Sequence, residues 1–394
     1  MTTRALILAA LLLTPVGLDA AESNRSPLLP DRLEPYRVAT EDGTWSLRFA
    51  LAAQVQYSFA SRDDESDIRI RRLRPVFSGS LGLKELTWKL HLNVVPGSLE
   101  FMDFYVDYQA LPDLRIRVGV FKIPFTRYRI QSFQRLTLVD WSILTGYVGA
   151  ERQLGFTFHN GYEKPQAIEY VVGVFTGQNT RGSHAVKLTG LYGVTAPNRS
   201  DLTGPDPFDG LHPEIVARVG YNHGGIDTRA DTDFQGGPVR FSAGLSAAWD
   251  IRPERFQDLA LRIAPEVLLK AHGFSMSALA CVGLVQMGDD LTDMDMGLWG
   301  VQAQASYLAA SRFELSVRYA FLQVLDALRK DVQANGIAGE TDDLEHRHEL
   351  SAGFNVYLVG HQFKWQTDFA WLPQTRPGGT LDEYRFRTQV QVSF

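Results

Sequence analysis

The stretch SLRFALAAQVQYSF, residues 46–59, alternates between apolar and polar side chains. Its apolar positions on one side are Leu47, Phe49, Leu51, Val55 and Tyr57. A period of two residues indicates a β-strand, because successive side chains of a strand point to opposite faces. Strands of soluble proteins are usually shorter than this segment. The stretch therefore predicts a long strand with one face against an apolar environment.

The same pattern recurs in fifteen later segments, which makes sixteen predicted strands. They span residues 67–82, 86–95, 100–110, 114–121, 152–160, 166–176, 213–222, 239–250, 258–270, 273–286, 298–309, 312–324, 344–359, 362–372 and 382–394. Short turns alternate with longer polar loops, at 60–66, 122–151, 177–212, 287–297, 325–343 and 373–381. This arrangement is typical of an outer-membrane barrel, so we expect an all-β transmembrane antiparallel β-barrel of about sixteen strands with long extracellular loops. One segment, 223–238, is long although it falls on the short-turn side; either the register differs there or this turn is elaborated.

Composition narrows the class of protein. The chain has 394 residues, 45% of them hydrophobic, a formal net charge of −6 and one cysteine. These values exclude a disordered chain and an intramolecular disulfide, and they do not suggest a nucleic-acid binder. After residue 25 no run of 18 apolar residues occurs, which excludes helical membrane spans but not barrel strands.

The N-terminus predicts export. Arg4 precedes a short apolar run, and small residues near position 21 offer a cleavage site, so residues 1–21 are predicted to be a signal peptide. The alternative is an ordinary buried N-terminal helix. We expect residues 22–45 to form a periplasmic segment and residues 46–394 the transmembrane barrel in the bacterial outer membrane.

A soluble β-sandwich, or several β domains, would also alternate. Three features favour the membrane. The segments recur at lengths that suit tilted spans, and aromatic residues such as Trp299, Trp365 and Trp371 lie toward the ends of apolar faces. The chain also ends in YRFRTQVQVSF, and a final strand ending in Phe matches the signal read by the barrel-insertion machinery. The predicted surroundings are therefore outer-membrane lipid and lipopolysaccharide.

If the apolar faces meet lipid, the opposite faces line the lumen. The cationic candidates there are Arg48, Arg69, Arg71, Arg72, Arg74, Lys89, Arg115, Arg117, Arg218, Arg240, Arg262, Arg318, Arg347, Lys364, Arg385 and Arg387. The acidic candidates are Asp103, Asp107, Glu169, Glu266, Glu314, Glu349 and Asp368. An excess of arginine raises the local concentration of anions, and its planar fork suits oxyanions. Alternatively these cations pair with lumen acids and brace the wall, as Asp103 and Asp107 could do for Arg115 and Arg117.

Residues 67–77, DIRIRRLRPVF, break the alternation. Ile68 and Ile70 share one face, but the apolar set then shifts to Leu73, Pro75 and Phe77. A β-bulge lets two successive residues oppose one and re-aims their side chains. A bulge at Arg71-Arg72 would turn Arg69, Arg71, Arg72 and Arg74 into the lumen. Without it some arginines would face hydrocarbon, at about 2–4 kcal/mol each near the midplane.

The loop 121–151 is rich in Phe, Trp, Ile and Leu and carries Arg127, Arg129 and Arg135. A loop of this composition is poorly suited to water. We expect it to fold into the lumen as a constriction loop; the alternative is a lid that packs on a neighbouring subunit.

The segments IRIRRLRPVFSGSLG, FMDFYVDY and LRIRVGVFKIPF resemble the phosphate-selective porin O and P family. The resemblance implies a sixteen-stranded, usually trimeric outer-membrane channel, with Arg71 and Arg72 as constriction arginines and Asp103, rather than Asp107, as the acidic partner. Two departures stand out. The family loop often has an acid after the KxPF motif, where Thr126 and Arg127 stand here, and only Lys89 and Lys364 supply lumen lysines.

The predicted function is passive diffusion of small anions such as phosphate or polyphosphate. The alternatives are a weakly selective general porin, a barrel enzyme using His159, His184 or His212, and a structural or adhesive barrel with a plugged lumen. No GxSxG, HExxH, P-loop, GxGxxG or CxxC pattern occurs, and no cofactor is expected. No metal site is expected either: His346 and His348 are interpreted as interfacial residues, and the acidic segment 289–295 as a solvated loop.

Overall fold

The computed structural model describes residues 33–62, 64–95, 98–148, 152–164, 166–176, 213–251, 259–286, 293–328, 345–376 and 378–394. The chain divides into residues 1–31 and a compact unit of residues 32–394, and the fold below is that of the second unit. The predicted signal peptide and the predicted loop 177–212 lie outside the described residues.

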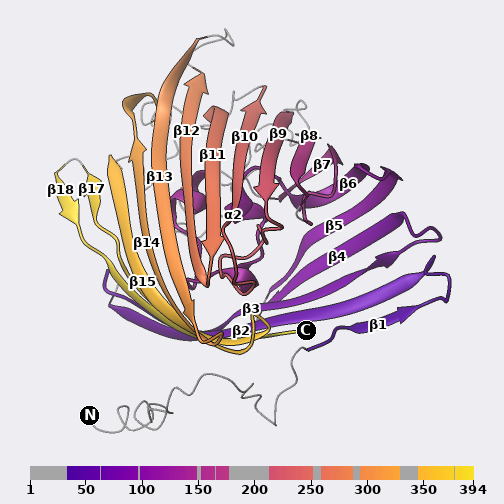
Figure 1. Ribbon diagram of the computed structural model, residues 1–394. Helices are drawn as coiled ribbons and strands as arrows, with labels where there is room; N and C mark the ends of the chain where they lie inside the picture. The colour runs from indigo at the N-terminus through magenta and orange to yellow at the C-terminus, as the bar shows by residue number, and fades with distance from the viewer. Residues whose placement is uncertain are drawn as a thin grey trace. The chain divides into compact units, whose positions relative to one another are not determined.

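Sixteen long strands form a closed antiparallel barrel (Figure 1). They are β2 (Ser46–Ala60), β3 (Glu65–Ser80), β4 (Leu86–Val95), β5 (Ser98–Leu111), β6 (Leu114–Lys122), β7 (Arg152–His159), β8 (Ile168–Phe175), β9 (Glu214–His223), β10 (Arg240–Asp250), β11 (Leu259–Ala271), β12 (Phe274–Gln286), β13 (Met294–Ala309), β14 (Phe313–Val324), β15 (His346–Val359), β16 (Phe363–Trp371) and β19 (Tyr384–Ser393). Each strand pairs with the next, and β19 pairs with β2 to close the ring. The barrel prediction is confirmed, and only β13, which begins four residues early, departs by more than two residues.

Shorter elements decorate the barrel. The strand β1 (Tyr36–Ala39) pairs with the start of β2, and the hairpin of β17 (Gln374–Arg376) and β18 (Gly379–Leu381) extends β15. Three short helices follow β6: α2 (Arg127–Ile130), the 3₁₀ helix η1 (Phe133–Arg135) and α3 (Ile143–Val148). Among the described residues, no helix has the length and apolar character needed to cross a membrane.

The two faces of the barrel wall differ as the alternation predicts. Val55 on β2 is 52% exposed, whereas Gln54 and Gln56 beside it are buried and donate to Gln391 and Gln389 of β19. Outward positions of the other strands are likewise large and apolar, so the barrel presents an apolar belt to lipid.

The predicted bulge lies at the predicted place. Arg72 pairs with Gln54 and Ile70 pairs with Val55, so Arg71 is the extra residue of β3. Residues directly opposite in an antiparallel pair share a face. The extra residue therefore lets Ile70 stay on the lipid face while Arg72 stays on the lumen face.

The segment after β6 folds into the barrel, as expected for a constriction loop. Ile123, Phe125, Leu144 and Val148 are fully buried, and they belong to one apolar cluster with lumen-facing residues of the opposite wall. Those wall residues are Val216, Ala248, Ala264, Leu279, Cys281, Leu298, Ala320, Leu322, Val324 and Ala370. The lumen along β9–β16 is thus filled with apolar packing, and Figure 1 shows α2 inside the ring of strands.

The long turn between β9 and β10 also enters the lumen. Ile226, Ala230, Asp231 and Asp233 are all at most 3% exposed although the turn sits at the short-turn end of the barrel. The strands on both sides pair without a register shift. The elaborated-turn interpretation is therefore correct.

Candidate functional site: an arginine-lined channel

The four arginines of β3 form a strip on the channel side of the wall. Arg69, Arg72 and Arg74 lie opposite Gln56, Gln54 and Ala52, whose side chains point inward. Arg71, the bulged residue, points the same way, because its guanidinium meets a carboxylate of the inward-folded loop. Arg72 is buried against that loop, and the side chain of Arg69, paired with Asp67 at 3.4 Å, is half exposed.

Asp140 is the acid that meets this strip. Its Oδ2 lies 3.2 Å from Nη2 of Arg71 and its Oδ1 lies 3.3 Å from Nη2 of Arg72. Burial raises the pKa of Asp140, but Arg72 and Arg71 outweigh burial and hold the pKa well below its usual range. The carboxylate is therefore charged at neutral pH and offsets part of the arginine charge.

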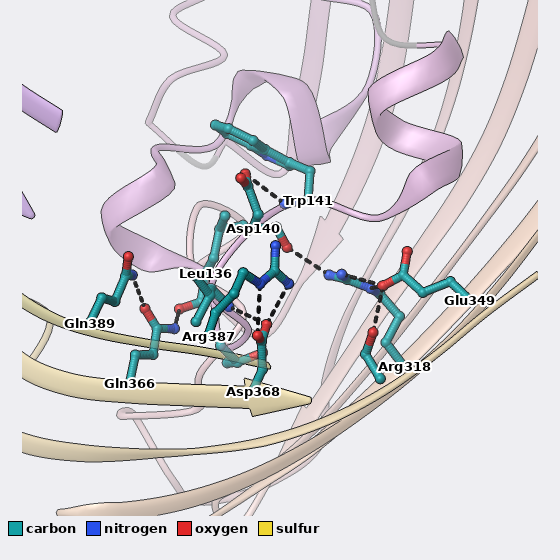
Figure 2. A network of polar contacts seen from close by, with 12 residues as sticks. Leu136, Asp140, Trp141, Arg318, Glu349, Gln366, Asp368, Arg387 and Gln389 are labelled. Carbon is teal, nitrogen blue, oxygen red and sulfur yellow. Dashed lines mark hydrogen bonds and ion pairs between the residues drawn. The ribbon is translucent and has the colours of Figure 1, made fainter. Parts of the chain in front are cut away.

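The loop backbone is held at this point by side chains of β14, β15 and β16. The carbonyl of Asp140 accepts a hydrogen bond of 2.9 Å from Nη1 of Arg318, which in turn donates to Glu349 (Figure 2). Asp368, paired with Arg387, accepts from the backbone amide of Val139 at 2.9 Å. These contacts fix the height at which Asp140 faces β3.

Aromatic rings of the loop order the arginines. The Phe133 ring centroid lies 4.9 Å from the guanidinium carbon of Arg72 and 4.7 Å from that of Arg74. The Trp141 ring lies 5.6 Å from Arg72 and 5.3 Å from Arg129. Cation–π contacts hold a guanidinium without neutralising its charge. The rings thus hold the guanidinium groups of Arg72 and Arg74 in place, and of these two only Arg72 also pairs with Asp140.

Asp103, the acid expected beside the constriction arginines, pairs elsewhere. It accepts from His91 at 2.9 Å, and lies 3.4 Å from Nζ of Lys89 and 2.5 Å from Nε of Arg152. The expectation that Asp103 is the partner of Arg71 and Arg72 is wrong. Among the ion pairs of the described residues, both arginines pair with Asp140. The sequence carries a signal for the actual partner, because Asp140 is the only acid between residues 122 and 150.

Two of the predicted pore arginines brace the wall. Arg115 and Arg117 both donate to Asp107, at 2.6 and 2.8 Å, and Arg117 also donates to Glu163 at 2.9 Å. His159, a candidate for the enzyme alternative, lies 3.1 Å from the same Asp107 and is buried. His184 and His212 lie outside the described residues. The bracing interpretation therefore holds for this cluster.

The arginines of β9–β16 and β19, called the far wall here, are paired in the same way. Its cations meet acids across neighbouring strands or turns: Arg218 with Glu169 and Glu266, Arg240 with Asp233, Arg262 with Glu214, Arg318 with Glu349, Arg347 and Arg385 with Glu383, and Arg387 with Asp368. Lys364 donates to the carbonyl of Leu136 in the loop. The excess of cations among the sixteen lumen candidates therefore overestimates the positive potential in the lumen, because the far-wall arginines are neutralised in ion pairs.

The loop arginines have separate positions. Arg127 is buried and pairs with Asp231 of the inserted turn at 3.2 Å, and its amide donates to Glu266. Arg129 is buried against Trp141. Arg135 is half exposed, 3.7 Å from Asp227. Only Arg135 of the three therefore faces open space directly.

That open space is a cavity of about 1500 Å³ along β1–β7, bounded by residues 132–135 of the loop. Arg48, on β2, is exposed into it, opposite Arg37 of β1. Its lining holds nine cations: Arg37, Arg48, Arg74, Lys84, Lys89, Arg115, Arg117, Arg135 and Lys164. The acids in the lining are Glu34, Asp107, Glu163 and Asp227. The accessible half of the lumen is therefore cationic.

The described residues offer no group of three or more His, Cys, Asp or Glu side chains that could hold a metal ion. His346 and His348 lie beside the outward Tyr319 and Phe321, with the Tyr319 hydroxyl 2.9 Å from Nδ1 of His348. They contact aromatic residues of the outer wall, as expected for interfacial positions. Much of the acidic segment 289–295 lies outside the described residues.

Comparison with solved structures supports the fold. The chain is similar to the outer-membrane channel DcaP of Acinetobacter baumannii, at 13% identity and a TM-score of 0.56, over 91% of this chain and 99% of that one. It is similar to OmpF of Salmonella typhi, at 12% identity and a TM-score of 0.57, over 91% and 100%. An anion-selective porin from Comamonas acidovorans matches at 12% identity and a TM-score of 0.54, over 89% and 100%.

Comparison of sequences supplies the family. An uncharacterized protein of Aquifex aeolicus is 22% identical over 274 residues, which is 66% of this chain, and the match spans only 60% of that relative's length. The family model described as phosphate-selective porin O and P matches residues 45–244, which include β2–β9, the constriction loop and the inserted turn. This chain belongs to the phosphate-selective porin O and P family.

Proposed function

We propose that this porin is an anion-selective diffusion channel, and that small oxyanions such as phosphate or polyphosphate are its preferred solutes. The observation that carries the proposal is the strip of Arg69, Arg71, Arg72 and Arg74 on the lumen side of β3. Asp140 of the constriction loop pairs with Arg71 and Arg72. Rings and strips of arginine select anions, and guanidinium groups bind oxyanions through two parallel hydrogen bonds.

The charge distribution supports an anion path on one side of the lumen. Anions that pass the strip enter the cationic cavity along β1–β7, where Arg74 belongs to both. Low-dielectric walls lined by one sign of charge focus the field on the passing ion. We further propose export through the signal peptide 1–21, folding by the barrel-insertion machinery, and assembly as a homotrimer in outer-membrane lipid and lipopolysaccharide. No catalytic role is proposed.

Bilayer recording tests the proposal. Purified protein in a planar lipid bilayer under a potassium chloride gradient should give a reversal potential of anion preference, and added phosphate should block the chloride current. A cation-selective reversal potential would overturn the proposal. A weakly selective current that phosphate leaves unchanged would favour the general-porin alternative.

The strip itself is tested by exchange of its two central residues. Arg71→Ala with Arg72→Ala should weaken phosphate block about tenfold or more, because charge-assisted hydrogen bonds contribute about 1.5–3 kcal/mol each. The matched control is Arg71→Lys with Arg72→Lys, which keeps the positive charge and removes the planar guanidinium that binds an oxyanion through two hydrogen bonds. Wild-type block in the alanine variant would show that the strip is only structural.

A further inference from the structure

We propose that the turn between β9 and β10, residues 224–239, is a second constriction element that sets the size limit of the channel by holding the constriction loop from the opposite end of the barrel. The proposal rests on the proposed channel function but not on its anion preference.

The turn crosses the lumen and is attached to several walls. Arg229 donates to Glu169 of β8 at 3.1 Å, and Asp233 accepts from Arg240 of β10 at 2.7 Å. Thr232 donates to Glu314 of β14 at 3.0 Å. A polar turn that only connected two strands would be solvated, whereas these side chains are all at most 6% exposed.

A buried lysine holds the conformation of the turn. Nζ of Lys270, on β11, donates to the carbonyls of Asp227 at 2.9 Å, Ala230 at 2.8 Å and Thr232 at 3.0 Å. An ammonium group has three donors, and all three are directed at this one segment. Lys270 is 1% exposed, so its charge is compensated by carbonyl dipoles rather than by water. Such a lysine has a positioning role.

The turn contacts the constriction loop at two residues, Arg127 and Arg135. Asp231 pairs with Arg127 at 3.2 Å, and its amide donates to the carbonyl of Arg135 at 3.2 Å. Asp227 lies 3.7 Å from the guanidinium of Arg135. Both the backbone and the side chain of Arg135, which lines the cavity, are thus set by the turn. Loss of the turn would free this end of the loop and open the lumen beneath it.

Replacement of residues 226–235 by Asn-Gly tests the proposal. We expect the variant to raise single-channel conductance by about twofold or more and to admit larger neutral sugars in liposome-swelling assays, because pore diameter limits passage. Neutral sugars make the readout independent of anion preference. A variant that migrates on gels as a folded, heat-modifiable barrel, yet keeps wild-type conductance and sugar size limit, would overturn the proposal.

Point variants cover the case in which the shortened chain does not fold. Asp231→Asn and Lys270→Met each remove a contact to or within the turn and should shift conductance and size limit in the same direction, to a smaller extent. The matched control is Asp42→Asn, the same exchange in an exposed turn at the start of β2, which should behave as wild type. Wild-type size limits in both Asp231→Asn and Lys270→Met would contradict the positioning role.

Discussion

Asp140 lies 3.3 Å from Arg72 although 68 residues separate them, and Arg71, the next residue, shares the same carboxylate at 3.2 Å. Two guanidinium groups thus share one carboxylate. Among the ion pairs of the described residues, neither Arg71 nor Arg72 meets a second carboxylate, so one positive charge of the pair is not neutralised. A solute anion in the channel would therefore meet a site that is already built for a negative group and is only partly satisfied.

Asp140→Asn should strengthen phosphate block and raise the anion-to-cation permeability ratio. The substitution keeps the shape of the side chain and removes the charge that competes with the solute. A partly exposed ion pair contributes about 0–1 kcal/mol, so the gain should reach at most about fivefold. Concentration-dependent block of the chloride current measures it. Weaker block than in wild type would mean that Asp140 chiefly holds the arginines in place.

Anion selectivity should be constant between about pH 5 and pH 8. The pKa of Asp140 is lowered in the folded channel, so the ion pair is fully present above the ordinary aspartate value of 3.8 and is lost as pH falls through the lower folded value. Arginine keeps its charge over this range. Reversal potentials across a pH series measure it. A change in selectivity with a midpoint between pH 5 and pH 8 would assign control to another group.

Deletion of Arg71 should leave a folded barrel. Arg71 is the extra residue of the bulge, so its removal leaves Arg72 opposite Gln54 and Ile70 opposite Val55 in a regular ladder. The matched control is deletion of Leu73, which would bring an arginine onto the lipid face at a cost of about 2–4 kcal/mol. Heat-modifiable migration on gels compares the two. Equal loss of the folded form in both variants would contradict the bulge assignment.

The alternation predicts the strands and the bulge, and the apolar composition of residues 121–151 predicts the inward loop, because each signal lies in consecutive residues. The role of Asp140 does not follow from the sequence pattern, because its partners are distant in sequence and only the folded loop brings them together. The sequence does not decide whether Arg218, Arg318 and Arg387 brace the wall, because each acid lies on another strand, and a shift of one residue in register would move it to the other face. Apolar residues on both faces, such as Leu279 and Leu298, were the available signal that the far lumen is packed.

Removal of Arg387 should lower stability more than it alters selectivity. Arg387 makes two hydrogen bonds of 2.7 and 2.8 Å to Asp368, and Asp368 also holds the constriction loop through the amide of Val139. Arg387→Met leaves the buried carboxylate unpaired, which costs about 3–5 kcal/mol. The matched control is Arg69→Met, whose pair with Asp67 is half exposed and contributes about 0–1 kcal/mol. The temperature at which the folded band is lost on gels measures both. Equal temperatures for the two variants would show that the far-wall pairs do not brace the barrel.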